Sequence, residues 1–170
     1  MNLPVVLLSQ LLNTKSGQSG YDLHKSIIEK LPYVWDCSHQ QVYRELNKLE
    51  TLGYVTFTVH PQDGKPDHKV YIITSEGRAY LDEQTQKPTP LPSMRNPLSA
   101  LILALDSQGK SATELLTNHA GACSKRIERL GKQRSNVAND DLLTALLDRQ
   151  INLLKVDLEW AKGLMESTNH

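Results

Sequence analysis

Side chains that can hydrogen-bond to base edges or neutralise phosphates recur at helical spacing within residues 38–53 (SHQQVYRELNKLETLG). The row that they form consists of Gln40, Arg44, Asn47 and Thr51, with Gln41 and Lys48 beside it. Glutamine pairs with adenine, arginine pairs with guanine, and lysine and asparagine can hold the phosphate backbone. The row therefore indicates a helix that reads double-stranded DNA. A solvated helix face of the same composition is the alternative.

The two ends and the inner side of this helix are also marked in the sequence. Ser38 with Gln41 three residues later is a capping-box pattern, and Gly53 suits the left-handed conformation that ends many helices. The opposite side is aliphatic and repeats at helical spacing, with Val42, Leu46 and Leu49. We therefore expect one face of the helix in the core and the other face toward a partner.

Five more elements are predicted around this helix. Residues 3–13 are apolar nearly all round and indicate a buried helix, although a short buried strand would show the same pattern. A second helix, with its own capping pattern, runs up to Pro32. Residues 54–60 and 69–74 alternate as strands around a Gly/Pro loop, which predicts a β-hairpin, and residues 75–86 are helical.

Three helices, a hairpin and a further helix follow the order of a winged helix-turn-helix module. In that module a helix N-terminus enters the major groove and the hairpin tip lies along the adjacent backbone. The tip here carries Lys65, His68 and Lys69, and Asp63 and Asp67 oppose them. The tip is therefore close to neutral, and an ordinary solvated hairpin is the alternative.

The overall charge of the chain gives no support for nucleic-acid binding. Lysine and arginine number 19, as do aspartate and glutamate, and residues 1–87 hold nine of the former and ten of the latter. DNA binding must therefore depend on where charges are placed and not on an excess of them. Aromatic residues make up only 5% of the chain, which argues against a base-stacking binder of single strands.

The second half of the chain is predicted to be helical. Residues 87–97 (KPTPLPSMRNP) are Pro-rich and indicate a stiff linker, and helices follow at residues 98–105 and 111–133. A final helix starts at Asp140 or Asp141. Its apolar residues recur at spacings of four and three and form a coiled-coil-like seam of Leu143, Leu147, Ile151, Leu154, Leu158, Ala161 and Met165.

Leu142, Leu146 and Leu153 widen the apolar surface of this final helix beyond a two-helix seam. A partner helix within the chain and another from a second copy would together cover this surface, and monomers rarely leave such a patch exposed. We therefore predict that the seam residues serve dimerisation. An intrachain hairpin alone is the alternative.

Three separated stretches resemble the PadR family of transcriptional regulators, and within it the AphA-like virulence activators. They are Gly20–Leu23 (GYDL), residues 38–55 and residues 62–77 (QDGKPDHKVYIITSEG), in the order that the family has them. The resemblance covers roughly the first half of the chain. It implies a dimeric, sequence-specific DNA-binding protein without catalytic activity, in a family whose members often respond to small molecules.

The resemblance also implies roles for individual side chains. Gln40, Gln41 and Arg44 would approach bases. Phosphates, or the minor groove beside the wing, would be approached by Tyr21, Ser38, Tyr43, Lys48, Lys65, His68 and Lys69. For the two tyrosines, a place in the core with a satisfied hydroxyl is an equal alternative.

The sequence thus predicts a mostly helical chain in three parts. These are a winged helix-turn-helix DNA-binding domain over residues 1–86, the linker over residues 87–97 and a helical dimerisation domain over residues 98–170. We expect a cytoplasmic homodimer that regulates transcription from a two-fold symmetric operator. The alternative is an effector-sensing or protein-interaction module with weak intrinsic DNA binding, which the neutral net charge keeps open.

Other classes of function find little support in the sequence. Cys37 and Cys123 lie far apart, and the pair of His119 and Cys123 lacks a third ligand, so neither a metal nor another cofactor is expected. No P-loop, Rossmann or nucleophile–base pattern is present, which predicts that the chain is not an enzyme.

No run reaches about 18 apolar residues, so a membrane role is not expected. A redox role for Cys37, next to a helix N-terminus that could lower its pKa, is a minor alternative.

Overall fold

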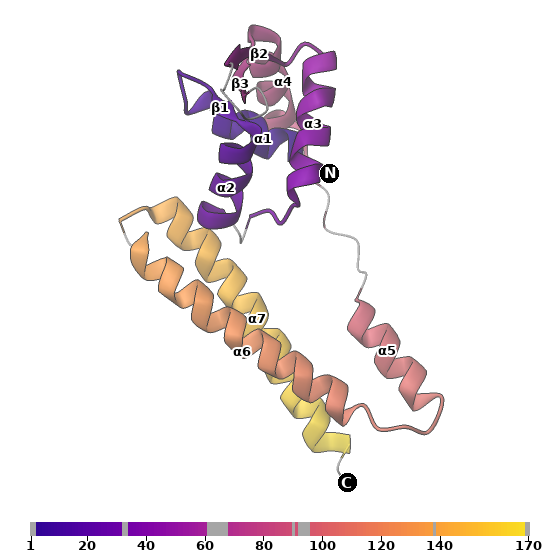
Figure 1. The fold of residues 1–170 in the computed structure, drawn as a ribbon. Helices are drawn as coiled ribbons and strands as arrows, with labels where there is room; N and C mark the ends of the chain where they lie inside the picture. The colour runs from indigo at the N-terminus through magenta and orange to yellow at the C-terminus, as the bar shows by residue number, and fades with distance from the viewer. Residues whose placement is uncertain are drawn as a thin grey trace. The chain divides into compact units, whose positions relative to one another are not determined.

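The computed structural model describes residues 3–31, 34–60, 68–89, 91, 96–137 and 139–168, which belong to two compact units, Met1–Pro90 and Leu91–His170. The elements of the first unit are α1 (Leu3–Leu12), β1 (Gln18–Ser19), α2 (Gly20–Lys30), α3 (His39–Thr51), β2 (Val55–His60), β3 (His68–Ile73) and α4 (Ser75–Gln86) (Figure 1). The second unit contains α5 (Pro97–Asp106), α6 (Thr113–Asn136) and α7 (Asp141–Thr168).

The sheet of the first unit is antiparallel, with the strand order β1-β3-β2. β2 and β3 form the predicted hairpin, in which Phe57 lies opposite Tyr71. β1 has only two residues, and it pairs with the other side of β3, where Gln18 faces Tyr71. This short strand was not predicted from the sequence, and it joins the segment before α2 to the wing.

The core of the first unit lies between its helices and the inner face of the sheet. Each of α1, α2 and α3 contributes a fully buried aliphatic stripe, and the residues that share this core include Leu7, Leu8, Leu11, Leu23, Ile27, Val42, Leu46, Leu49 and Tyr71. The first segment is therefore a buried helix, as predicted, and not the short buried strand that was the alternative. Trp35, on the connection before α3, packs against the same core.

The second unit is built on the packing of α6 against α7 (Figure 1). Leu116 and Leu130 of α6 and Leu147 of α7 are completely buried. The predicted start of α7 is confirmed, because the Asp140 carboxylate accepts a hydrogen bond from the Leu143 N–H at 2.9 Å. The two helices therefore form a hairpin that buries aliphatic side chains inside one chain.

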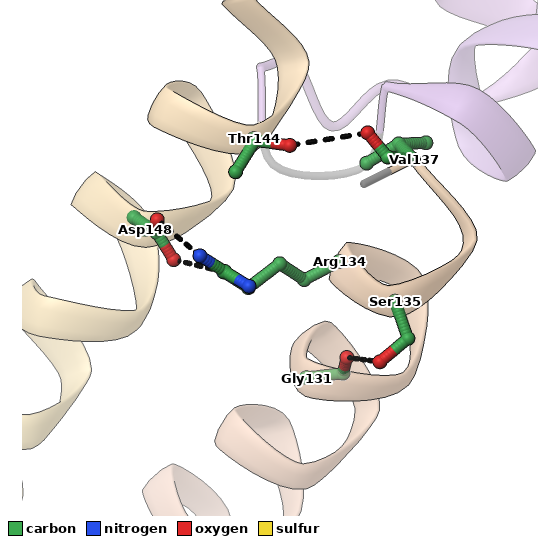
Figure 2. A network of polar contacts seen from close by, with 6 residues as sticks. All are labelled: Gly131, Arg134, Ser135, Val137, Thr144 and Asp148. Atoms are coloured by element: carbon green, nitrogen blue, oxygen red, sulfur yellow. Dashed lines mark hydrogen bonds and ion pairs between the residues drawn. The ribbon is translucent and has the colours of Figure 1, made fainter. Parts of the chain in front are cut away.

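Polar contacts close the end of this hairpin (Figure 2). The guanidinium of Arg134 holds the Asp148 carboxylate with two hydrogen bonds, one of 3.0 Å from Nη2 to Oδ2, and the Thr144 hydroxyl donates to the Val137 carbonyl at 3.1 Å. The bond from Arg134 lowers the pKa of Asp148. Both partners of the ion pair are exposed, and a surface pair adds little stability by itself. The main effect of these contacts is therefore on the register between the two helices.

The seam that was predicted to serve dimerisation faces α6 of the same chain. Leu147, Ile151 and Ala161 are buried, and the other seam residues, Leu143, Leu154, Leu158 and Met165, are half-buried. A second row on α7 is exposed, and its apolar members are Leu142, Leu146, Leu153, Val156 and Trp160. The second row is therefore exposed for contact between chains, whereas the three buried members of the seam are covered within the chain.

None of the helices among the described residues combines the length and the apolar character that crossing a membrane requires.

The two rows of α7 differ in what they contribute to the stability of the folded chain. Leu147 is 0% exposed and Leu142 is 69% exposed. We expect Leu147→Ala to lower the free energy of unfolding by about 2–5 kcal/mol, because it leaves a cavity in the hairpin. Leu142→Ala should change it by less than about 0.5 kcal/mol at a protein concentration low enough to keep chains apart. Urea unfolding of both variants tests this assignment, and equal losses would contradict it.

Candidate nucleic-acid interface

The N-terminus of α3 is held by reciprocal hydrogen bonds between Ser38 and Gln41. The Ser38 hydroxyl accepts from the Gln41 N–H at 3.2 Å, and the Gln41 side-chain oxygen accepts from the Ser38 N–H at 2.7 Å. This confirms the predicted capping box. The bidentate reading of adenine needs both the amide oxygen and the amide nitrogen of a glutamine. While it caps the helix, the Gln41 oxygen is held at the Ser38 N–H, so this side chain is less free than that of Gln40 to adopt the bidentate geometry.

The predicted row on the outer side of α3 is exposed along its length. Its exposed members are Gln40, Arg44, Asn47, Lys48 and Thr51, while the opposite stripe of the helix is buried. The helix ends as expected at Gly53, whose φ of 74° lies in the left-handed region. Apart from an ion pair of 3.7 Å between Lys48 and Glu45, these long side chains remain directed at solvent. α3 thus carries the side chains that were predicted to read bases on a helix whose two ends are both defined.

The side chain of Tyr43, on α3, lies against the start of α2. The side chain is half-buried, and its ring lies against Gly20, where an added Cβ would stand 2.7 Å from the Cζ atom of the tyrosine. A side chain at this first position of α2 would therefore displace the ring. Tyr43 positions α3 against α2, whereas Tyr21, at the start of α2, is 58% exposed and free to reach a ligand.

Two histidines that the sequence did not single out lie beside the tyrosines. The His39 ring contacts Tyr43 at 4.6 Å between centroids, His24 at 5.3 Å and Tyr21 at 6.4 Å. His39 is the first residue of α3 and is exposed. In the sequence, only the place of His39 directly after the capping serine could have indicated this cluster. His24 comes close to His39 only through the packing of α2 on α3, which no local pattern shows.

The wing is described only at its base. Lys69 is exposed, and its Nζ lies 3.8 Å from the centroid of the Phe57 ring, a cation–π contact that fixes the direction of the side chain. Lys65, with the rest of residues 61–67, and the side chain of His68 lie outside the described residues. Of the three cations predicted at the tip, the structure thus describes the side chain of one.

The two cysteines are buried and free. Burial, and then the charge of Asp36, raises the pKa of Cys37, which is the opposite of the lowering that a redox role next to a helix N-terminus would need. Burial also raises the pKa of Cys123, whose sulfur shares a hydrogen bond of 3.5 Å with His119 Nε2. Among the described residues, no group of three or more His, Cys, Asp or Glu side chains could hold a metal ion.

A comparison with known families identifies the first unit. Residues 7–83 match the transcriptional regulator PadR-like family. The first unit of the chain thus matches this family. A probable transcriptional regulator of Mycobacterium tuberculosis, Rv1176c, is 39% identical over 88 residues, which are 52% of this chain and 46% of that protein. The negative transcriptional regulator PadR of Bacillus subtilis is 35% identical over 78 residues, which are 46% of this chain and 43% of that protein. These alignments span about half the length of the relatives.

Solved structures of PadR-like proteins extend the likeness to both units. The virulence activator AphA of Vibrio cholerae is 29% identical, with a TM-score of 0.79 and 98% of each chain covered. Bacillus subtilis PadR in complex with operator DNA is 21% identical, with a TM-score of 0.80 and 97% of each chain covered. The same protein has been solved with p-coumaric acid. The predicted fold class, a winged helix followed by a helical part, is confirmed by this likeness.

The contact between Gly20 and Tyr43 predicts a specific coupling in this PadR-like winged helix. We expect Gly20→Ala to lower the free energy of unfolding by about 1–3 kcal/mol, because the new methyl group displaces the ring. In a Tyr43→Ala background the same change should cost far less, since the ring is gone. A double-mutant cycle measured by urea unfolding tests this. An equal cost in both backgrounds would show that the ring is not what excludes a side chain at Gly20.

Proposed function

We propose that this protein is a homodimeric, sequence-specific DNA-binding regulator of transcription, without enzymatic activity, that acts in the cytoplasm on a two-fold symmetric operator. The main observation in favour is the outer row of α3, which is exposed on a helix whose other side is buried in the core. The match of residues 7–83 to the PadR-like family supports the same function. A related protein, Bacillus subtilis PadR, has been solved on operator DNA.

The roles that we propose along α3 follow from the hydrogen-bonding atoms that each side chain leaves unoccupied. Arg44 and Gln40 are exposed and would read bases, because the hydrogen-bonding atoms of both side chains remain available. Lys48 and Asn47 would hold phosphates. Gln41 would position the helix, because its oxygen is engaged in the cap. The N-terminus of α3 itself favours a phosphate, since its first N–H groups and its dipole point toward the DNA.

Phosphate contacts outside α3 would come from the wing and from α2. Lys69 is exposed and is directed by Phe57, and Tyr21 is exposed at the start of α2. Lys65 and His68 remain predicted wing contacts. Because the chain is neutral overall, these placed charges would supply most of the sequence-independent affinity, and that affinity should weaken as salt rises.

The exposed row of α7 is the surface that we propose for the homodimer. Leu142, Leu146, Leu153, Val156 and Trp160 recur at spacings of four and three once Arg149 is counted among them, which is a heptad pattern on the side of α7 away from the buried seam. α5 adds the exposed Leu101 and Leu103. Monomers rarely expose so many large apolar side chains in one row. Two such rows would pair around a two-fold axis and set the half-sites about 34 Å apart, or a multiple of it.

The alternative, an effector-sensing module with weak intrinsic DNA binding, is favoured by one observation, the neutral charge of the chain. A related protein, Bacillus subtilis PadR, has been solved with p-coumaric acid, so a small molecule is a reasonable effector class to screen. If an effector raises affinity for DNA, the purified protein alone should bind poorly. Binding assays with and without cell extract separate the two functions.

The first experiment is a titration of the purified protein with the promoter region of its own gene and with random DNA, each at two salt concentrations. A regulator should prefer the promoter fragment and should lose affinity for both DNAs as salt rises. If it shows no preference, the titration is repeated with fragments of the whole genome, with and without cell extract. Binding to none of these fragments would contradict DNA-binding regulation.

Arg44 and Lys48 should respond differently in this assay. Arg44→Ala is expected to cost about 1–3 kcal/mol at the selected site and to relax specificity there, because it removes a base contact. Lys48→Ala should weaken binding to every sequence alike and reduce the salt slope by about 1, because it removes a phosphate contact. If Arg44→Ala left the affinity for the selected site unchanged, α3 would not be the reading helix.

The dimer surface can be tested with one charge. Leu153→Glu places a carboxylate in the middle of the exposed row and should shift the protein from dimer to monomer in sedimentation velocity, because the charge would lose its water in the interface. Lys155→Glu introduces the same carboxylate at an exposed position of α7 outside the row and should leave the dimer intact. A dimer that survives Leu153→Glu would show that another surface joins the chains.

A further inference from the structure

The densest cluster of positive charge in the chain lies on α6, in the helical unit. Residues 125–134 (KRIERLGKQR) contain five of the 19 lysines and arginines of the chain and a single carboxylate, that of Glu128. The five cations are Lys125, Arg126, Arg129, Lys132 and Arg134. This stretch is therefore a local excess of positive charge in a chain that is neutral as a whole.

Two of these cations are engaged within the helical unit. Lys132 is paired with Glu128 at 2.7 Å, and Arg134 is paired with a carboxylate of α7 (Figure 2). In the part of the chain that the structure describes, no carboxylate forms an ion pair with Lys125 or Arg129. Both of these side chains are exposed, so their charges are left for a partner outside the chain.

The arrangement of these cations is unfavourable for α6 itself. Lys125 and Arg129 are four residues apart on one face of the helix, where like charges destabilise it. The helix dipole favours cations only in the last turn, and α6 continues to Asn136, so the dipole does not compensate for this repulsion. On α7, by contrast, the three cations are spread six and seven residues apart, as is usual on a solvated face. An anion held between Lys125 and Arg129 would turn the repulsion into attraction.

The first three cations of the stretch also line a hollow. Lys125, Arg126 and Arg129, together with Ala122, border a space of about 330 Å³. Small-molecule sites span about 300–1,000 Å³, so this volume suits a ligand at the small end of that range. The side chain of Ala122 ends at Cβ and leaves the space open. Room for a small ligand and three positive charges thus occur at the same place.

The number and the type of these cations favour a phosphate over a carboxylate. A phosphate monoester carries a charge of about −1.5 to −2 near pH 7 and has three terminal oxygens that accept hydrogen bonds, whereas a carboxylate carries one charge and has two oxygens. An arginine can bind phosphate with two parallel hydrogen bonds, and a lysine adds a compact charge. Two arginines and one lysine therefore match the charge and the acceptors of a phosphate group.

We propose that Lys125, Arg126 and Arg129 bind the phosphate group of a small phosphorylated molecule on α6. The bound phosphate removes the repulsion between Lys125 and Arg129, because each then lies beside a negative charge. Binding therefore also stabilises the helical unit. The site is on a different helix from the candidate nucleic-acid interface, so this binding does not depend on whether α3 reads DNA.

Phenyl phosphate and benzoate are matched probes for this site, because they share a ring and differ in the anionic group. Each is titrated into the full chain by calorimetry at about pH 7.5, with sodium chloride added to keep the ionic strength constant. Phenyl phosphate should bind at one site per chain, and benzoate at least about tenfold more weakly, because it accepts fewer charge-assisted hydrogen bonds. No saturable binding of phenyl phosphate, or an equal affinity for benzoate, would overturn the proposal.

Single neutral substitutions locate the site. Lys125→Gln and Arg129→Gln should each weaken the binding of phenyl phosphate about tenfold or more, which is the cost of one charge-assisted hydrogen bond. Lys155→Gln removes the same charge from an exposed position of α7 and should leave the affinity unchanged. Affinity that persists in both α6 variants, or that falls equally in Lys155→Gln, would show that these cations do not form the site.

Thermal unfolding of the full chain gives an independent measurement. Inorganic phosphate should raise the Tm of the wild type more than sodium chloride of the same ionic strength does, because it binds the folded state. This difference should vanish in the double variant Lys125→Gln/Arg129→Gln. The double variant should be at least as stable as the wild type in chloride, since it lacks the like-charge pair. A phosphate effect that the double variant retains would contradict the proposed site.

A random-sequence DNA duplex distinguishes the two sources of phosphate. If phenyl phosphate does not bind and the double variant loses affinity for the duplex, the cations hold DNA phosphates, which would overturn a small-molecule ligand. A wild type that binds phenyl phosphate but no DNA would contradict the DNA-binding function alone. Binding of phenyl phosphate that depends on Lys125 and Arg129, with the duplex affinity unchanged in the double variant, supports the proposed site.

Discussion

Burial of the aliphatic stripe of α3 is the constraint from which the arrangement of the first unit follows. Val42, Leu46 and Leu49 are held in the core by α1 and α2, and the cap at Ser38 fixes where the helix begins. Once the inner side is committed in this way, the rotation of the helix is determined. The exposed row is then directed outward by packing and does not depend on any contact of its own.

The sequence was sufficient for most of the fold because the signals were local. The capping box, the glycine after α3, and the alternation of the hairpin strands each depend on a few neighbouring residues, and each is found as expected. β1 was missed because a two-residue strand has no periodicity to detect, and its residues read as a polar turn. β1 forms because β2 covers only one edge of β3, and the other edge is left for a further strand to pair with.

The candidate site was harder to predict, because periodicity shows that a row is apolar or polar but not what covers it. α7 carries two apolar rows, and the sequence alone did not show which of them would face α6. In the structure, Leu147 of the seam is buried and Leu142 of the other row is exposed. By contrast, spacing predicted the outer row of α3, and the capping-box pattern already indicated that the Gln41 side chain would bond to the Ser38 N–H. The approach of His24 to His39 depends on how α2 packs on α3, which no local pattern records.

The short β1 strand has a mechanical consequence. It pairs with β3 through Gln18 and Ser19, and Ser19 is also the N-cap of α2, where its hydroxyl accepts from the Asp22 N–H at 3.0 Å. A single residue therefore ends one strand of the wing sheet and starts a helix that packs on α3. The base of the wing and the start of α2 cannot shift independently without breaking that strand pairing or that cap. A partner would thus meet a preorganised surface, so that little conformational entropy remains to be lost on association.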